Sequence, residues 1–499
     1  MLENRRRIIA TFLSFFLASH AMWRAANTRA DVRLAGVFAD HMVLQRDVPL
    51  PVWGRADAGE SITVQIAQRT EKTTADKDGR WRVDLKPLIP STEPTTLTVR
   101  GAKNEIVIRD ILVGDVWLAS GQSNMQYSLK GTHDAADALA KANRPLLRLC
   151  SVGNKASLKP MDDRELKWSV CTRETARSFS GVAYHFGREV SDLEKVPVGL
   201  IGAYVSGTPA QSWANLEALE SSPKLRHYLD DLRTDPPSTN PSGVNGGTPT
   251  ALYNGMIAPL QPFAIRGVIW YQGESNTDRA DEYRTLFPAL ITGWRRQWGE
   301  RNFPFLFVQL PGFHEREPEP SPSKWAMLRE AQTAALQLQN TGMAVTLDLV
   351  PQRAILHPKN KSGVGHRLAL LAEVYAYGRE IPCEGPTFES MRAQDDGSIR
   401  VRFKNVGGGL KIAAPPEDRS ANQPTTMPSA VKGFSIAGAD HHFVWADATI
   451  DGPDTVIVRS DRVPSPVAVR YGWAENPEVN VYNSDGLPMA PFRSDDWPE

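Results

Sequence analysis

Hydrophobic and polar positions follow one pattern from about residue 31 to residue 110. Short runs alternate apolar and polar residues, as in SITVQIA (61–67) and WRVDL (81–85), and turn residues such as Asp76–Gly79 separate them. Alternation with a period of two residues is typical of half-buried strands. We therefore expect an N-terminal β-sandwich domain over residues 31–110, with a structural or substrate-framing role.

The pattern changes at residue 111. Continuous apolar runs now alternate with segments whose apolar residues recur at helical spacing. The runs predict buried strands at 198–205, 265–271, 305–310 and 343–349, and the spacing predicts helices at 175–196, 283–298, 324–338 and 361–377. Strands that are apolar throughout, alternating with amphipathic helices, indicate a parallel sheet covered on both faces. We expect an α/β domain over residues 111–380.

Alternating runs return in the last part of the chain, as in SIRVRF (398–403) and TVIVR (455–459). They predict a C-terminal β-rich domain over residues 381–499. The tail from residue 473 is loop-like in composition. It nevertheless carries the large apolar residues Tyr482, Leu487, Phe492 and Trp497. Because such side chains are usually buried, we expect the tail to pack back on the folded protein.

The first thirty residues have the composition of a signal peptide. Arg5–Arg7 precede an apolar stretch at 8–18 that is too short to span a bilayer well, and small residues follow it. Cleavage after Ala21, Ala26 or Ala30 fits this pattern. We expect a secreted or periplasmic protein, with no membrane association once residues 1–30 are removed; an uncleaved N-terminal anchor is the alternative.

Charge and cysteine content exclude several classes of function. The 57 basic residues balance the 57 acidic residues, which argues against a nucleic-acid groove or a polybasic membrane patch. Cys150, Cys171 and Cys383 match neither a disulfide framework nor a zinc pattern. A Cys150–Cys171 bridge and three free thiols both remain open, and nothing in the sequence indicates an oligomeric state.

The stretch GDVWLASGQSNM (114–125) carries the first candidate for chemistry. An apolar run breaks abruptly into a small polar cluster that contains Ser123, which indicates a buried strand followed by a sharp turn. Taken alone, this cluster fits a helix cap equally well. Two further predicted strands also end in polar clusters, SGTPAQSW (206–213) and QGESN (272–276). Because the carboxyl ends of parallel strands meet at one edge of a sheet, this convergence favours Ser123 as a nucleophile.

A catalytic serine needs a base within hydrogen-bond reach. His357 follows the predicted strand that ends near Leu349 and precedes a predicted helix, so we expect it at the same edge and take it as the base. The acid that would orient His357 is Asp348 or its rival Glu274. We place Asp348 first.

Donors for an oxyanion should come from other turns at that edge. We expect the backbone N–H groups of Ser123 and Gly207 and the side chain of Gln272 to serve. The neighbouring Gln122, Asn124, Glu274 and Asn276 are expected to support the turns. The chain lacks the common zinc, phosphate-loop and dinucleotide motifs, so we expect neither metal nor cofactor. Met125 stands where the G-x-S-x-G nucleophile elbow of α/β-hydrolases needs glycine, which disfavours an α/β-hydrolase.

Five ordered motifs together resemble the sialate O-acetylesterase family of SGNH-type hydrolases. They are GDVWLASGQSNM, SGTPAQSW, LYNGMIAPL, VIWYQGESN and HPKNKSGVGHRLA, and the likeness extends to the closing GLPMAPFRSDDWP. The resemblance implies an SGNH-type three-layer α/β/α hydrolase domain with a parallel sheet, flanked by N-terminal and C-terminal β-domains. It also implies carbohydrate O-deacetylation by a serine nucleophile without metal. Ser123 matches the nucleophile, His357 the base, and Gly207 and Gln272 the oxyanion positions.

One position departs from the SGNH pattern. These enzymes commonly place an acid three residues before the histidine, where this chain has Ala354. The acid then comes from Asp348 or Glu274, or the site works as a Ser–His dyad. We expect a carbohydrate O-acetylesterase acting on acetylated sialic acid or related glycans. Acetylated xylan or another plant or algal polysaccharide is the alternative substrate, and a non-catalytic glycan-binding protein is the second alternative.

Overall fold

A computed structural model of the 499-residue chain describes residues 31–234, 244–299, 302–351, 353, 355–416 and 428–498. The chain forms two compact units. The smaller unit contains residues up to Leu34, Val52–Val83 and Leu97–Val107, and the larger contains Ala35–Pro51, Asp84–Thr96 and Ile108–Glu499. The predicted signal peptide lies outside the described residues.

The smaller unit consists of β-strands, as its alternating pattern predicts. Strand β4 (Ser61–Ile66) pairs antiparallel with β5 (Arg69–Thr74) and with β7 (Ser91–Arg100). Strand β3 (Leu50–Arg55) lies between β1 (Arg33–Leu34) and β6 (Arg80–Leu85) in a second sheet. The apolar positions of β4 are buried and the positions between them are more exposed, so the strand buries one face.

Residues 35–51 and 84–96, expected in the N-terminal domain, group instead with the larger unit. Strand β2 (Val43–Gln45) accounts for part of this difference because it pairs with β8 (Glu105–Gly121), with Val43 opposite Leu112. Strand β8 also joins two runs, 105–109 and 116–119, that the sequence pattern treats as separate strands.

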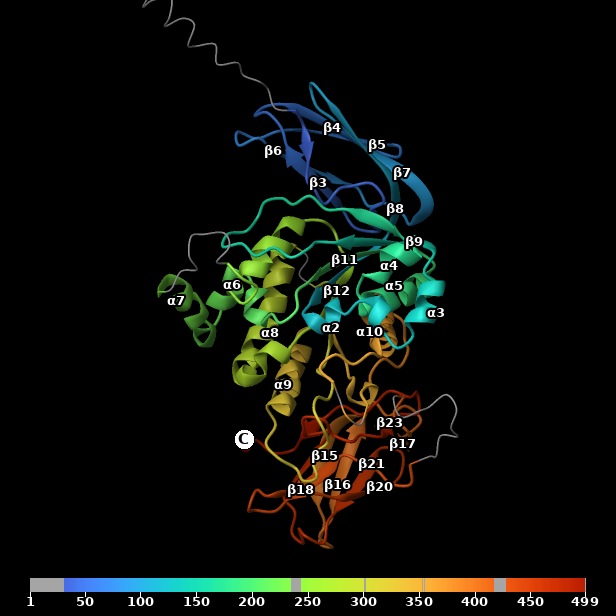
Figure 1. Ribbon diagram of the computed structural model, residues 1–499, viewed down its shortest axis with the longest axis vertical. Helices are drawn as coiled ribbons and strands as arrows, with labels where there is room; N and C mark the ends of the chain where they lie inside the picture. Colours follow the sequence, from blue (N-terminus) through green and yellow to red (C-terminus); the bar gives the residue numbers. More distant parts are fainter. Residues whose placement is uncertain are drawn as a thin grey trace, which may run out of the picture. The chain divides into compact units, whose positions relative to one another are not determined.

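The larger unit is an α/β structure built on a large mixed sheet (Figure 1). Its strands lie in the order β10-β9-β11-β8-β12-β13-β14. Their bounds are β9 (Arg144–Ser151), β10 (Trp168–Cys171), β11 (Val198–Tyr204), β12 (Gly267–Tyr271), β13 (Phe305–Val308) and β14 (Thr341–Ala344). Neighbours from β9 to β14 are parallel, as predicted, but β10 runs antiparallel to β9. The sheet is mixed because no crossover helix separates β9 from β10.

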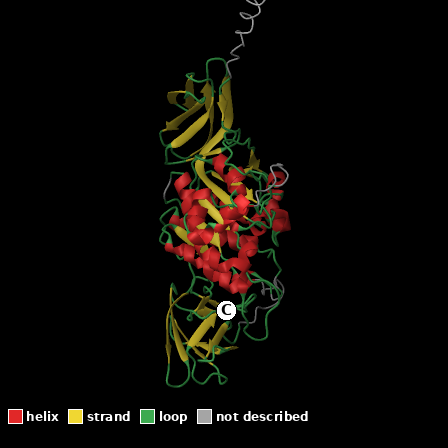
Figure 2. Ribbon diagram, turned by 90° about the vertical axis from the view of Figure 1, so that its left-hand side faces the viewer, coloured by secondary structure: helices red, strands yellow, loops and turns green. Residues whose placement is uncertain are grey.

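Helices cover both faces of this sheet (Figure 2). On one face, Trp117 of β8 contacts Phe186 of α5 (Gly181–Glu194), with ring centroids 5.0 Å apart. On the other, Trp270 of β12 stacks on Phe287 of α8 (Ala280–Gln297) at 6.1 Å. Trp270 pairs with Ser120, an odd number of positions from Trp117, so the two indoles point to opposite faces. Helix α10 (Lys361–Tyr375) packs on α5, and α9 (Lys324–Thr333) packs on α8.

Two predicted elements end early. The predicted strand 343–349 stops at Ala344, and Leu347–Leu349 form a 3-10 turn. The predicted helix 175–196 divides into α4 (Arg173–Arg177) and α5. The Ser180 hydroxyl accepts a hydrogen bond from the Ala183 N–H at 3.1 Å, so a new helix begins there.

The C-terminal part contains two four-stranded sheets. Their strands, in sheet order, are β15 (Thr387–Ala393), β16 (Ile399–Lys404), β21 (Thr455–Arg459) and β20 (Asp447–Ile450), then β19 (Phe443–Trp445), β18 (Phe434–Ala437), β22 (Ala468–Tyr471) and β24 (Phe492–Arg493). Strand β24 belongs to the tail, and so does β23 (Val481–Tyr482), which pairs with β17 (Lys411–Ile412). In the described residues, the tail thus contributes strands to two of the C-terminal sheets.

The two cysteines left open by the sequence are buried free thiols. Cys150 lies on β9 opposite Trp168, and the Cys171 thiol on β10 donates to the Ala142 carbonyl at 3.2 Å. No bridge joins them in the described part of the chain.

Candidate active site

Ser123 lies where β8 ends and the short helix α2 (Ser123–Gln126) begins. Gly121 makes this turn possible, because its φ is +132° and a Cβ there would lie 2.1 Å from the Tyr271 carbonyl oxygen. The Gln122 N–H donates to that same oxygen at 3.0 Å. The turn is thus pressed against the end of β12, and it leaves Ser123 half-buried.

Gly207 lies on the turn that follows β11. Its φ is +70°, and a Cβ there would meet nothing within 4 Å, so this backbone faces open space. The adjacent Ser206 donates from its N–H and its hydroxyl to Gln126 Oε1, each at 2.8 Å. Because Gln126 belongs to α2, these bonds tie the Gly207 turn to the Ser123 turn.

Gln272 is fully buried, and its amide is already engaged. Its Nε2 donates to the Thr208 carbonyl at 3.3 Å and to Asn276 Oδ1 at 2.7 Å, while its Oε1 accepts from the Tyr283 hydroxyl at 3.1 Å. Both amide hydrogens are therefore used inside the protein. These contacts favour a structural role, and the oxyanion role of Gln272 stays a prediction.

Gln122 is hydrogen-bonded to the QGESN turn. Its Oε1 accepts from the N–H groups of Gly273 (3.4 Å) and Ser275 (3.3 Å). Asn276 is also buried, and its Oδ1 accepts from the Ala210 N–H at 2.8 Å. Together these amides hold the turns after β8, β11 and β12 against one another.

Asn124 connects Glu274 to the loop that carries His357. Its Nδ2 donates to Glu274 Oε1 at 2.5 Å and to the Leu356 carbonyl at 2.9 Å, and its Oδ1 accepts from Lys361 Nζ at 2.5 Å. Burial raises the pKa of Glu274 above its ordinary value. The second carboxylate oxygen of Glu274 is buried without a hydrogen-bond partner.

His357 is half-buried, and its Nε2 is a buried atom that has no hydrogen-bond partner among the described residues. Its ring lies 6.1 Å from the Tyr127 ring, centroid to centroid. Burial, aided by the positive charge of Lys361, lowers the pKa of His357 below its ordinary value. An imidazole in this state is neutral near pH 7 and is able to accept a proton.

Among the contacts of the described residues, no carboxylate is hydrogen-bonded to His357. Asp348 is fully buried and accepts two 2.6 Å hydrogen bonds from the guanidinium of Arg367, one at each carboxylate oxygen. This pairing favours a structural role for Asp348, whose role as orienter stays a prediction. In the described structure, Glu274 is linked to the His357 loop through Asn124. Ala354 lies outside the described residues.

Lys361 is the residue that the sequence pattern misses. As the first residue of α10 it would ordinarily lie in solvent, yet it is fully buried. The only signal in the sequence is its position four residues after His357, within HPKNKSG.

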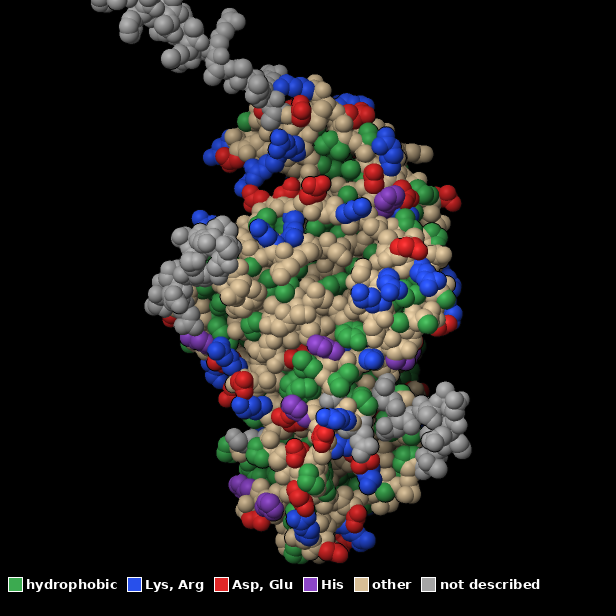
Figure 3. All heavy atoms as spheres, in the orientation of Figure 1, with side chains coloured by type: hydrophobic (Ala, Val, Ile, Leu, Met, Phe, Trp, Pro, Cys, Tyr) green, Lys and Arg blue, Asp and Glu red, His purple; other side chains and the backbone are tan. Residues whose placement is uncertain are grey.

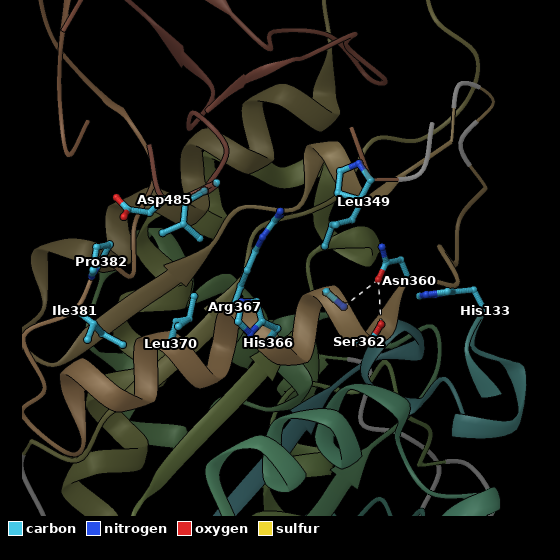
Figure 4. A pocket seen from close by; sticks show the side chains of 14 residues that line it. His133, Leu349, Asn360, Ser362, His366, Arg367, Leu370, Ile381, Pro382 and Asp485 are labelled. Atoms are coloured by element: carbon cyan, nitrogen blue, oxygen red, sulfur yellow. Dashed lines mark hydrogen bonds between the residues drawn. The ribbon is translucent and has the colours of Figure 1, made fainter. Parts of the chain in front are cut away.

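A cavity of about 760 Å³ opens beside the first half of α10 (Figure 4). Its walls include His133, Asn360, His366 and Asp485, but neither Ser123 nor His357. The Asn360 side chain accepts from the Gly363 N–H at 2.9 Å and so caps the helix. The cavity therefore adjoins the loop of His357 without containing the candidate nucleophile.

Three observations concern metal binding, membrane-spanning helices and surface charge. Within the described ranges, no cluster of three or more His, Cys, Asp or Glu residues is arranged to hold a metal ion. None of the helices found there has both the length and the apolar character needed to cross a bilayer. On the face shown in Figure 3, side chains of both charge signs are interspersed.

Comparison with known proteins gives consistent matches. Residues 113–373 match the family model described as carbohydrate esterase, sialic acid-specific acetylesterase. Sialate O-acetylesterase of Rattus norvegicus is 30% identical over 92% of this chain and 94% of its own length, and that of Homo sapiens is 28% identical over 94% of each. The crystal structure of a carbohydrate acetylesterase from Xanthomonas citri superposes with a TM-score of 0.82 and is 39% identical, covering 93% of this chain and 100% of that one.

Proposed function

This chain belongs to the sialic acid-specific acetylesterase family of carbohydrate esterases and is an ester hydrolase; we propose that it removes O-acetyl groups from sialic acid or a related glycan by serine catalysis. The observation that carries the proposal is the meeting of Ser123, Gly207 and the His357 loop at one edge of the sheet. They are joined there by the hydrogen bonds of Gln126 and Asn124.

In the proposed reaction, Ser123 Oγ attacks the acetyl carbonyl carbon while His357 takes the hydroxyl proton. The N–H groups of Ser123 and Gly207 stabilise the oxyanion. The C–O bond to the sugar then breaks, and His357 returns the proton to the departing sugar oxygen. A water molecule, deprotonated by His357, then attacks the acetyl-serine carbonyl. The bond between the acetyl carbon and Ser123 Oγ breaks, acetate leaves, and His357 returns the proton to Ser123 Oγ.

Two observations support these roles. The buried Nε2 of His357 has no partner within the described structure, so it is available to a serine hydroxyl. Gly207 presents backbone to open space rather than to packed side chains. We further propose that the helices and sheet of the larger unit form an SGNH-type three-layer domain flanked by β-domains, and that residues 1–30 direct the protein to the periplasm or the exterior.

Acetate release by the purified protein and by Ser123→Ala tests the mechanism. The variant is expected to lose nearly all hydrolysis of an acetylated sugar while keeping its unfolding temperature. Unchanged acetate release by Ser123→Ala would exclude the proposed nucleophile. Absence of release by the unaltered protein, with retained glycan binding, would favour the non-catalytic binding protein.

The substrate is tested with a panel of acetylated sialic acid, xylan and pectin fragments. The sialate O-acetylesterases that match this chain favour sialic acid as the first substrate. A kcat/KM at least tenfold higher on acetylated xylan than on acetylated sialic acid would instead indicate a plant polysaccharide as the substrate, with the same mechanism.

A further inference from the structure

The side chain of Lys361 is enclosed at the catalytic edge of the sheet. It is fully buried, and its Nζ donates to Asn124 Oδ1. The rings of Tyr127 and Tyr271 lie 5.3 Å and 5.2 Å from Nζ, a distance at which an ammonium is attracted to an aromatic face. A buried lysine is costly and is seldom found without a partner that needs its charge or its hydrogen bond.

Asn124 links Lys361 to the loop that carries His357. Asn124 directly follows Ser123, and its amide nitrogen donates to the carbonyl of Leu356, which directly precedes His357. One amide therefore sets the nucleophile turn against the loop of the base. Because Lys361 holds the other end of that amide, the lysine fixes the orientation in which Asn124 donates to Leu356 and Glu274.

The charges around Lys361 are few. Glu274 accepts a hydrogen bond from the same Asn124 side chain that Lys361 holds. The Tyr127 ring lies 5.3 Å from Lys361 Nζ and 6.1 Å from the His357 ring, so the ammonium and the imidazole adjoin the same tyrosine. The two tyrosines lie on the remaining sides, and burial raises the pKa of Tyr271 well above its ordinary value, so it is neutral. The His133 ring is hydrogen-bonded to the carbonyl of Lys359, two residues before Lys361, at 3.2 Å.

Burial lowers the pKa of Lys361 to about 7, against the Glu274 carboxylate, which raises it. The lysine is therefore charged in the acidic range, where a histidine base is at risk of protonation. In that range a nearby positive charge opposes protonation of the imidazole.

We propose that Lys361 is a positioning residue for His357: it orients Asn124, and through it the His357 loop, and its ammonium keeps the imidazole unprotonated in mildly acidic solution. The proposal rests on the proposed function, because it assigns a purpose to a residue beside the proposed base.

Three variants separate the charge from the hydrogen bond. Lys361→Gln keeps a donor for Asn124 but removes the charge, Lys361→Arg keeps both, and Lys361→Met removes both. The readout is the pH profile of kcat/KM, together with the pH dependence of Ser123 labelling by a fluorophosphonate, which does not depend on substrate binding. Unfolding temperatures of all variants are measured alongside.

In Lys361→Gln and Lys361→Met the acidic limb is expected to move to higher pH. Activity at pH 5 should then fall roughly threefold or more beyond any change at pH 8. Lys361→Arg should keep the limb of the unaltered protein. Lys361→Met should also lose kcat at pH 8, because Asn124 loses its donor. Acidic limbs that coincide in all four proteins would overturn the proposal.

Two controls keep the result interpretable. If the neutral variants fail to fold, the test uses the unaltered protein alone. The acidic midpoint of its Ser123 labelling, plotted against pH, is expected below the ordinary histidine pKa of about 6.5. A midpoint at or above that value overturns the proposal. Ser123→Ala separates the two hypotheses, because retained hydrolysis in that variant rejects the proposed nucleophile whatever Lys361 does.

Discussion

At the scale of single residues, the candidate site is defined by which polar atoms already have partners. His357 Nε2 is buried and unpartnered, whereas the amide of Gln272 and the carboxylate of Asp348 are occupied within the protein. An atom whose hydrogen-bonding capacity is filled must break a bond before it can serve a substrate. This distinction separates residues suited to the reaction from residues suited to holding the turns.

Asp348→Asn tests whether Asp348 supports the fold or the base. Because Arg367 would be left buried without its counter-charge, the variant should lose about 3–5 kcal/mol of unfolding free energy. The acidic limb of its pH profile should stay where it lies in the unaltered protein. Denaturant unfolding and kcat/KM against pH check this. Unchanged stability with a large loss of kcat would make Asp348 the orienter.

Gln272→Ala tests the oxyanion role in the same way. Removal of the amide takes one hydrogen-bond partner from each of the Thr208 carbonyl, Asn276 Oδ1 and the Tyr283 hydroxyl. The free energy of unfolding should therefore fall by about 1–3 kcal/mol. The loss of kcat should stay below the roughly 10²–10³-fold typical of a lost oxyanion donor. A loss of that size with an unchanged unfolding temperature would restore Gln272 to the oxyanion hole.

At the scale of elements, the position of Ser123 depends on one close approach between backbones. The end of β8 and the end of β12 meet at Gly121, where the Tyr271 carbonyl occupies the space of a side chain. Gly207 also has a positive φ, but a Cβ built there would meet no atom within 4 Å. The two glycines therefore serve different physical needs.

Gly121→Ala and Gly207→Ala form a matched pair for this difference. Both place an alanine at positive φ, which costs roughly 1–2 kcal/mol. Gly121→Ala must also move the Tyr271 carbonyl, so it should be clearly less stable than Gly207→Ala and should lose most of its activity. Thermal unfolding and acetate release measure the contrast. Equal unfolding temperatures in the two variants would contradict it.

Most strands and helices could be predicted because their signals are local. The apolar runs of β11, β12 and β13 end close to where predicted, and β21 has the predicted bounds. The partners of buried polar groups could not be predicted in this way. Lys361 meets Asn124 across 237 positions of sequence, and no local period reports such a contact. The antiparallel direction of β10 likewise follows from its connection rather than from its composition.

At the scale of the larger unit, buried arginines join segments that lie far apart in the sequence. Arg329 of α9 is fully buried and donates to backbone carbonyls of Pro311, Gly472, Ala474 and Glu475. Pro311 lies in the loop after β13, and the other three residues lie in the segment after β22. Burial lowers the pKa of Arg329 to about 9, so it remains protonated at pH 7.

Arg329→Met is therefore expected to weaken the attachment of the segment after β22 more than it affects the catalytic turns. The methionine replaces much of the volume but none of the donors, so several buried carbonyls lose their partners, at a cost of about 1–3 kcal/mol each before relaxation. The variant should unfold at lower temperature, and limited proteolysis should cut first between residues 472 and 476. The pH profile of the surviving activity should match that of the unaltered protein, because the hydrogen bonds of the Arg329 side chain within the described residues go to Pro311 and to the segment after β22, not to the turns of Ser123 and His357. Cleavage that begins instead in the His357 loop would show that Arg329 supports the active site directly.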